Sequence, residues 1–183
     1  QSIELKKPTQ PLPLYVPDRS WDGIRDYLYL VYLRPLKQYD LELHPVSLGF
    51  TYADDDLTVT AVPSYHLLPS EARRRELGAR PESQAFSYTI AAGGKRVYLS
   101  GDIDTPDEAA EHGAGADVAV VEIAHFEPEA LGEALTGSGI SRLIVTHVLE
   151  SLEPHEADLP GRINAAGFEG DVVVATDGLE MEI

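Results

Sequence analysis

Cysteine is absent from this 183-residue chain, which excludes disulfides, cysteine-ligated zinc sites and thiol nucleophiles. Basic residues are scarce: 14 lysines and arginines stand against 31 aspartates and glutamates, for a formal net charge of −17. A surface this acidic repels phosphate backbones, so nucleic-acid binding is disfavoured. The chain lacks an apolar run near the ~20 residues of a membrane span, and its first residues carry no signal-peptide core. We therefore expect a cytoplasmic protein without membrane contact.

What is present is a change of hydrophobic period along the chain. The first half alternates apolar and polar residues around a Gly93-Gly94 turn, as β-hairpins do, and the second half alternates short apolar runs with helical segments. We expect strands at 12–16, 41–43, 57–62, 84–91, 96–100, 117–123, 142–146, 171–175 and 179–183, and helices at about 20–33, 106–112, 127–135 and 154–166. The pattern predicts an α/β fold in one domain, with a mixed sheet and outer helices.

Four of the expected strands end near a residue that binds metals or transfers protons. These residues are His66, Asp102, His125 and His147. One histidine at a strand end is usually structural, but several strands that place such residues at the same end of a sheet indicate a shared site. Imidazole nitrogen and carboxylate oxygen together suit zinc, and also iron or manganese.

The other ionisable residues of these segments have simpler interpretations. Glu122 lies inside an apolar strand, three positions before His125, and we interpret it as the group that orients that histidine. The remaining histidines, His44, His112 and His155, do not follow buried strands in this way. We interpret His44 as structural and the other two as surface residues.

Six segments carry a resemblance to a known family. They are Pro13-Leu14-Tyr15-Val16-Pro17, Tyr65-His66, Phe86-Ser87-Tyr88-Thr89-Ile90, Tyr98-Leu99-Ser100-Gly101-Asp102, Leu143-Ile144-Val145-Thr146-His147 and Ala175-Thr176-Asp177-Gly178-Leu179-Glu180. In this order they resemble the later motifs of the metallo-β-lactamase-fold hydrolases, and most closely those of the ribonuclease Z-like branch. The resemblance spans nearly the whole chain and implies an αββα sandwich of mixed sheets with outer helices.

The same resemblance implies roles for the residues at the strand ends. His66 would ligate one metal ion, Asp102 would bridge two ions, and His147 would ligate the other. His125 would donate a proton to the leaving oxygen, with Glu122 behind it. The cofactor implied is a pair of Zn²⁺ ions, with Mn²⁺ or Fe²⁺ as alternatives.

The sequence departs from the family in one respect. The family's His-x-His-x-Asp-His cluster is absent, and in relatives it precedes the segment that resembles residues 13–17. We therefore expect residues 1–183 to be a single domain of this fold, incomplete at its N-terminus and with an apolar sheet face left uncovered. A second chain that completes the site, or a degenerate site, are the alternatives.

The function that follows is hydrolysis at a dinuclear metal site, with a phosphodiester as the favoured substrate and an ester or lactone as another small-molecule option. A first alternative is tRNA 3′-end processing, although the net charge and the lack of a basic, glycine-rich arm disfavour it. A second alternative is a non-catalytic scaffold or subunit of the same fold. Relatives are often dimers, so a homodimer is a further expectation.

Overall fold

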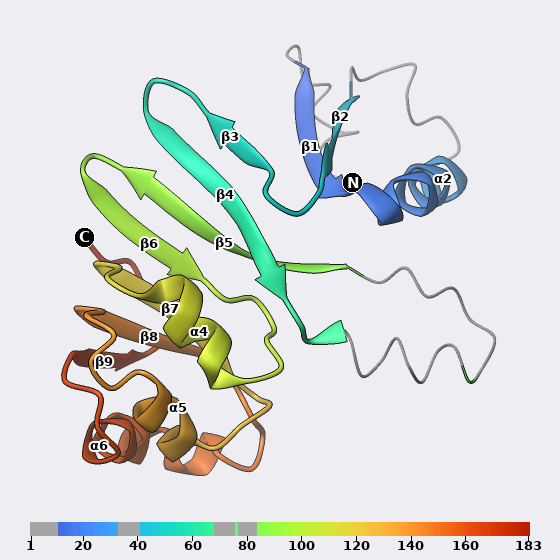
Figure 1. The fold of residues 1–183 in the computed structure, drawn as a ribbon. Helices are drawn as coiled ribbons and strands as arrows, with labels where there is room; N and C mark the ends of the chain where they lie inside the picture. The colour runs from blue at the N-terminus through green and yellow to red at the C-terminus, as the bar shows by residue number, and fades with distance from the viewer. Residues whose placement is uncertain (1–10, 33–40, 68–75, 77–83) are drawn as a thin grey trace. The chain divides into compact units, whose positions relative to one another are not determined.

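The computed structural model describes residues 11–32, 41–67, 76 and 84–183 (Figure 1). The chain divides into two compact units, one made of residues 1–47 and 71–84 and the other of residues 48–70 and 85–183. All the residues predicted for the site belong to the second unit. The expectation of one domain, incomplete at its N-terminus, stays a prediction.

The first unit contains a two-stranded parallel sheet and a helix. Strand β1 (Leu12–Pro17) pairs with β2 (Leu41–Val46), and the short 3₁₀ helix η1 (Asp18–Ser20) leads into α2 (Trp21–Tyr32). Strand β2 is longer than predicted because it continues through Pro45, which a strand paired on one side tolerates. The His44 ring stacks on the Tyr15 ring at a centroid distance of 4.8 Å, which agrees with a structural role.

The second unit is built on a seven-stranded sheet in the order β3-β4-β5-β6-β7-β8-β9. Strands β3 to β6 pair antiparallel, and β6 to β9 pair in parallel. The strands are β3 (Thr51–Ala53), β4 (Leu57–Ser64), β5 (Ala85–Ala92), β6 (Lys95–Leu99), β7 (Val118–Ile123), β8 (Arg142–Val148) and β9 (Asp171–Val174). The helices are α4 (Pro106–Gly113), α5 (Pro128–Ala134), η2 (Glu153–Asp158) and α6 (Leu159–Ala165). The predicted hairpin half and βα half are both confirmed.

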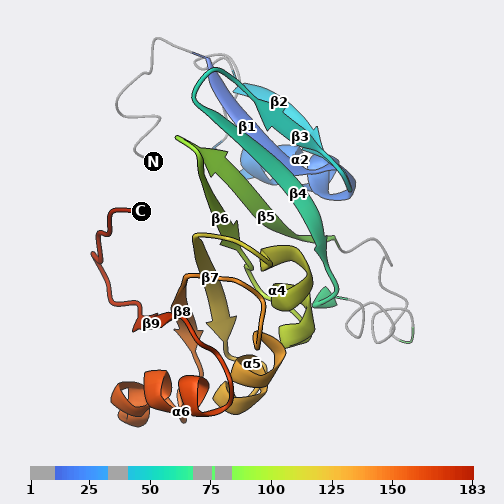
Figure 2. The same ribbon diagram turned by 60° about the vertical axis from the view of Figure 1, so that its left-hand side comes forward.

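The core of this unit lies between one face of the sheet and the helices α4, α5 and α6, which are grouped beside the parallel strands (Figure 2). The fully buried core side chains of the strands occupy alternate positions on that face; they are Tyr98, Ala119, Val121, Ile123, Leu143 and Val145. The helices contribute Ala109, Leu131 and Ile163 to the same cluster. Burial of each large apolar side chain is worth about 1.5–3 kcal/mol, so this face fixes the register of the parallel strands.

Three local expectations were wrong. Strand β4 does not end before Pro63, because Pro63 pairs with Phe86 inside the β4–β5 ladder. The helix expected over 154–166 is broken, since η2 ends at Asp158 and His155 has a non-helical backbone. Residues 179–183 form no strand. After a turn in which the Leu179 N–H donates to the Thr176 carbonyl oxygen, this segment lines a hollow over the sheet instead.

Among the described residues, no helix combines the length and the apolar character that crossing a membrane requires.

Candidate metal-binding site

The topology brings the predicted site residues to one edge of the sheet. Strands β6, β7 and β8 are parallel, so they end at the same edge. Strand β4 runs antiparallel to β5, which runs antiparallel to β6, so β4 ends at that edge too. The carboxyl ends of strands in α/β sheets are where binding sites form. His66, Asp102, His125 and His147 lie at or just beyond the ends of these four strands, and they form what we call the histidine–aspartate cluster.

Asp102 and His147 are in direct contact. His147 Nδ1 lies 3.0 Å from Asp102 Oδ1, and about half of each side chain is exposed to solvent. Gly101 turns the chain sharply just before Asp102, with a φ of 57° that only glycine adopts without cost. The turn places the carboxylate beyond the end of β6, where it meets the histidine of β8.

His147 is the extra residue of a β-bulge in strand β8. Glu122 pairs with Thr146, but the next residue, Ile123, pairs with Val148, so His147 has no partner on β7. His147 also has a φ of 47°, the only positive value at a non-glycine residue in the described part of the chain. A bulge bends the strand and redirects the side chain of the extra residue. The predicted strand 142–146 is therefore two residues longer, and His147 lies within it rather than beyond it.

His125 is held by a buried carboxylate. Its Nδ1 lies 2.6 Å from Oε1 of Glu122, whose side chain is 1% exposed, whereas the His125 side chain is 35% exposed. Glu122 also accepts hydrogen bonds from the backbone N–H groups of Ile103 (3.2 Å) and Ala124 (2.6 Å). A carboxylate at Nδ1 fixes the tautomer and orientation of an imidazole, so Nε2 is the nitrogen left for chemistry. The arrangement supports the predicted orienting role of Glu122.

The three histidine rings of the cluster are neighbours. The His66 and His125 ring centroids are 4.5 Å apart, and the His125 and His147 centroids are 5.8 Å apart. The His125 ring therefore lies next to both of the other rings, and the Asp102 carboxylate joins the group through His147. The four predicted strand-end residues are brought together, and the fifth predicted residue, Glu122, contacts His125.

The donors of the cluster suit a borderline metal ion such as zinc, since they are imidazole nitrogens and one carboxylate. Within the residues that the structure describes, no three of the His, Asp and Glu side chains already surround a single metal position. The donor chemistry fits, and the Asp102–His147 pair brings a nitrogen and an oxygen ligand within 3.0 Å of each other. Asp102 and His147 are therefore the residues that would hold a metal ion if one is bound here.

Ser64 and Glu108 lie near the cluster and were not predicted to take part in the site. The Ser64 hydroxyl donates to the carbonyl oxygen of Asp102 (2.7 Å), and the Tyr65 N–H donates to Oε2 of buried Glu108 (2.8 Å). The pattern Thr105-x-x-Glu108 before a helix is a capping-box signal, so the capping contact of Glu108 is predictable from the sequence. No sequence pattern indicates the contact with Tyr65, because it joins residues 43 positions apart.

The two remaining histidines of this unit are not part of the cluster. His155 is exposed in η2, where its Nδ1 lies 4.0 Å from Asp158 Oδ2. His112 was predicted to be a surface residue, but its Nε2 is buried and has no hydrogen-bond partner among the described residues. His112 lies in the last turn of α4, and its carbonyl oxygen accepts a hydrogen bond from the Arg96 side chain of strand β6.

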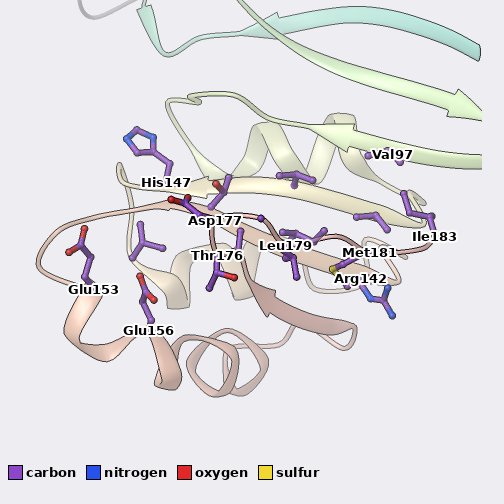
Figure 3. Close-up of a pocket in the computed structure, with 17 residues that line it drawn as sticks. Val97, Arg142, His147, Glu153, Glu156, Thr176, Asp177, Leu179, Met181 and Ile183 are labelled. Carbon is purple, nitrogen blue, oxygen red and sulfur yellow. The ribbon is translucent and has the colours of Figure 1, made fainter.

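A hollow of about 610 Å³ lies next to His147 on the sheet face opposite the helices (Figure 3). Its apolar floor includes Val97, Val120 and Ile144, which alternate with the core residues of the same strands. Figure 3 shows His147, Glu153, Glu156 and Asp177 at one end of the hollow, and Arg142 and Ile183 at the other. The acidic end of the hollow therefore adjoins the cluster.

A family comparison identifies the fold to which this geometry belongs. The model of the Beta-lactamase superfamily domain matches residues 2–148, which end one residue after His147. The chain belongs to the beta-lactamase superfamily. The match contains every residue of the histidine–aspartate cluster, together with Glu122. The match does not assign the chain to the ribonuclease Z-like branch of this superfamily.

Solved structures agree with this family at the level of the fold. The metallo-beta-lactamase fold protein YhfI from Bacillus subtilis has a TM-score of 0.69 and 16% identity, over 93% of this chain and 65% of its own. Zn²⁺-bound PqqB from Methylobacterium extorquens has a TM-score of 0.66 and 15% identity, over 98% of this chain and 67% of its own. A diphosphatase of the PhnP family has a TM-score of 0.62 and 15% identity, over 95% of this chain and 59% of its own.

These structures confirm the predicted fold class, a mixed α/β metallo-β-lactamase fold with sheets and helices. The chain spans about two thirds or less of the length of these proteins. No curated protein sequence matches the chain at a significant level.

Proposed function

We propose that the histidine–aspartate cluster is the metal-binding centre of a hydrolase that acts on a phosphodiester. The observation that carries this proposal is the convergence of three histidine rings and one carboxylate at one edge of the sheet, with Asp102 Oδ1 3.0 Å from His147 Nδ1. Membership of the beta-lactamase superfamily supports it, and so does the Zn²⁺ ion named for the PqqB structure.

In this proposal His66, Asp102 and His147 would hold two zinc ions, with Asp102 as a ligand of both. Divalent cations so bound lower the pKa of water and neutralise the anionic transition state of phosphodiester cleavage. The chain's own contribution is to fix the ligands. The bulge in β8 redirects His147, and the Gly101 turn places Asp102 beside it.

His125 is the proposed proton donor to the leaving oxygen. Its Nδ1–H donates to Glu122, so the proton that is transferred is the second one, which the imidazolium form of His125 carries on Nε2. The centroid of the His125 ring lies 4.5 Å from that of His66 and 5.8 Å from that of His147. A substrate bound between His66 and His147 would therefore lie within reach of the His125 side chain. Glu122 is buried and held by two backbone N–H groups, which prevents the pair from turning away.

A phosphodiester is the proposed substrate class because two cations match its charge. The similarity to the PhnP-family diphosphatase supports a substrate with a P–O bond, and the similarity to an isothiocyanate hydrolase from Delia radicum gut bacteria supports hydrolysis in general. A small-molecule ester or lactone remains the alternative for the same residues.

The test is metal content and hydrolysis of bis(4-nitrophenyl) phosphate by the full-length protein. We expect bound zinc, activity that a chelator removes and zinc restores, and loss of both metal and activity in Asp102→Asn and His147→Ala. His155→Ala is the matched control, since His155 is exposed and outside the cluster. No metal above background in the wild-type protein would overturn the proposal and favour the non-catalytic scaffold.

The same preparation separates the remaining alternatives. Cleavage of a precursor tRNA that disappears in His147→Ala would favour tRNA 3′-end processing, which the net charge of −17 disfavours. Hydrolysis of 4-nitrophenyl acetate or a lactone, without the phosphodiester, would move the substrate class to carboxylic esters. Sedimentation of the same sample tests the expected homodimer.

A further inference from the structure

Glu108 is a buried carboxylate that the proposed chemistry does not use. It lies in the first turn of α4, and 3% of it is exposed. Three backbone N–H groups donate to it: Tyr65 to Oε2 at 2.8 Å, and Asp104 and Thr105 to Oε1 at 2.7 and 3.1 Å. Charge-assisted hydrogen bonds of this length are the strong ones, and they offset the cost of burying the carboxylate.

The three donors come from two distant parts of the chain. Asp104 and Thr105 belong to the loop that follows Asp102 and begins α4. Tyr65 directly precedes His66 and lies 43 positions before Glu108. Helix capping accounts for the contacts on Oε1 but not for the contact on Oε2. Glu108 therefore joins the loop of His66 to the loop of Asp102.

A second hydrogen bond joins the same two loops. The Ser64 hydroxyl donates to the carbonyl oxygen of Asp102 at 2.7 Å, and Ser64 is 9% exposed. Two residues in succession before His66 are thus fixed to the segment that carries Asp102. We call these contacts, from Tyr65 to Glu108 and from Ser64 to Asp102, the two inter-loop hydrogen bonds.

We propose that Glu108, assisted by Ser64, is a positioning residue that holds His66 in place relative to Asp102 for metal binding. This rests on the proposed function, in which both residues hold metal. His66 contributes no backbone to the sheet, because β4 ends at Ser64. Its position therefore depends on the loop contacts rather than on strand pairing.

Glu108→Gln separates the positioning role from the capping role. A glutamine side chain has only one acceptor oxygen. In the wild-type protein two N–H groups, of Asp104 and Thr105, donate to Oε1 of Glu108, and one, of Tyr65, donates to Oε2. The glutamine oxygen is therefore expected to keep the contacts with Asp104 and Thr105, while its NH₂ group faces the Tyr65 N–H and cannot accept from it. The variant loses the link to the His66 loop and keeps the start of α4.

The experiment measures amide hydrogen exchange and zinc affinity in the full-length protein. In Glu108→Gln we expect exchange at Tyr65 to accelerate about tenfold, with Asp104 and Thr105 unchanged. We expect zinc affinity to fall about tenfold, as for other groups that orient metal ligands. Glu111→Gln is the matched control, because Glu111 lies on the same helix and is exposed.

Ser64→Ala gives an independent measurement if Glu108→Gln does not fold. It removes the second inter-loop hydrogen bond without touching α4, and we expect zinc affinity to fall in it as well. Wild-type zinc affinity in every variant that folds would overturn the proposal, and so would equal acceleration at Tyr65, Asp104 and Thr105 in Glu108→Gln. If the wild-type protein binds no zinc, the proposed function fails, while unchanged exchange at Tyr65 in Glu108→Gln would still overturn the link on its own.

Discussion

Nδ1 of His147 lies 3.0 Å from Oδ1 of Asp102, and the histidine reaches this position as the unpaired residue of a β-bulge. In a regular strand, successive side chains alternate between the faces, and Val145 is already directed into the core. Without the bulge, the side chain of His147, two positions after Val145, would also point toward the helices. The extra residue, with its φ of 47°, frees the side chain to meet Asp102 at the edge of the sheet.

Substitutions at His147 should therefore separate backbone strain from metal binding. Asn tolerates the left-handed backbone, so His147→Asn should change the free energy of unfolding by less than about 0.5 kcal/mol while zinc affinity falls at least about tenfold. His147→Val places a β-branched residue at the same φ and should lose about 1–3 kcal/mol of stability. Urea unfolding of the metal-free proteins and zinc titration check both, because bound zinc would itself stabilise the folded state. Equal stability of the two variants would contradict the role of the strained backbone.

Glu122→Gln tests whether the carboxylate orients His125. The amide oxygen is expected to stay at the Oε1 position, where Ile103 and His125 donate, so the Ala124 N–H loses its acceptor. A neutral amide also stabilises the protonated His125 ring less than a carboxylate does. We expect kcat on bis(4-nitrophenyl) phosphate to fall about 10²-fold while zinc content is unchanged, because Glu122 is not a proposed ligand.

Exposed Glu169 provides the control for that experiment, as Glu169→Gln should leave kcat unchanged. A loss of zinc equal to the loss of kcat in Glu122→Gln would show instead that the carboxylate supports metal binding. Stability should drop by about 1–3 kcal/mol, since one buried donor is left without an acceptor.

Much of the second unit could be predicted from the sequence, because its signals are local. The Gly93-Gly94 turn and the alternation on either side of it specify the hairpin of β5 and β6. The apolar run of β7 is long enough only for a buried strand. Once these strands share a sheet, the convergence of Asp102, His125 and His147 follows from parallel pairing alone.

The details that aim the site residues could not be predicted, because they depend on contacts between distant segments. The bulge at His147 appears only when β8 is aligned with β7, since the sequence around it reads as a regular strand end. The hydrogen bond from the Tyr65 N–H to Glu108 joins two segments 43 positions apart, and no sequence pattern indicates that they meet. Residues 179–183 alternate like a strand, yet they line the hollow over the apolar sheet face.

Gly132 marks the closest approach of α5 and α6. A Cβ atom at Gly132 would clash with the carbonyl oxygen of Ile163 and lie 2.8 Å from the Ala166 Cβ. Gly132→Ala should therefore force the helices apart and cost about 1–3 kcal/mol of stability. Gly161→Ala is the control, because nothing lies within 4 Å of its Cβ position, and it should be neutral or stabilising by up to about 1 kcal/mol. Chemical denaturation measures both, and equal effects would contradict close packing at Gly132.

Tyr98 provides a prediction about alkaline pH. Its side chain is fully buried, its hydroxyl lies near the Ser87 side chain without a hydrogen bond of good geometry, and burial, assisted by the charge of Glu108, raises its pKa to about 12. An unfolded tyrosine ionises near pH 10, so the unfolded state releases the proton first and the protein loses stability as the pH rises from about 10 to 12. Tyr98→Phe should remove this contribution and, at neutral pH, add about 1 kcal/mol, because no buried hydroxyl is left unpaired.

The measurement for Tyr98 is the difference in unfolding free energy between wild-type protein and Tyr98→Phe at pH 7, 9, 10 and 11. Other groups also titrate at alkaline pH, but they are common to both proteins and cancel in the difference. The advantage of the phenylalanine variant should be constant up to about pH 9 and then grow. Tyr88→Phe is the control, because Tyr88 is only partly buried and its pKa is raised less by the same cause. A difference that stays flat up to pH 11, or one that Tyr88→Phe reproduces in full, would show that Tyr98 ionises as it does in the unfolded chain.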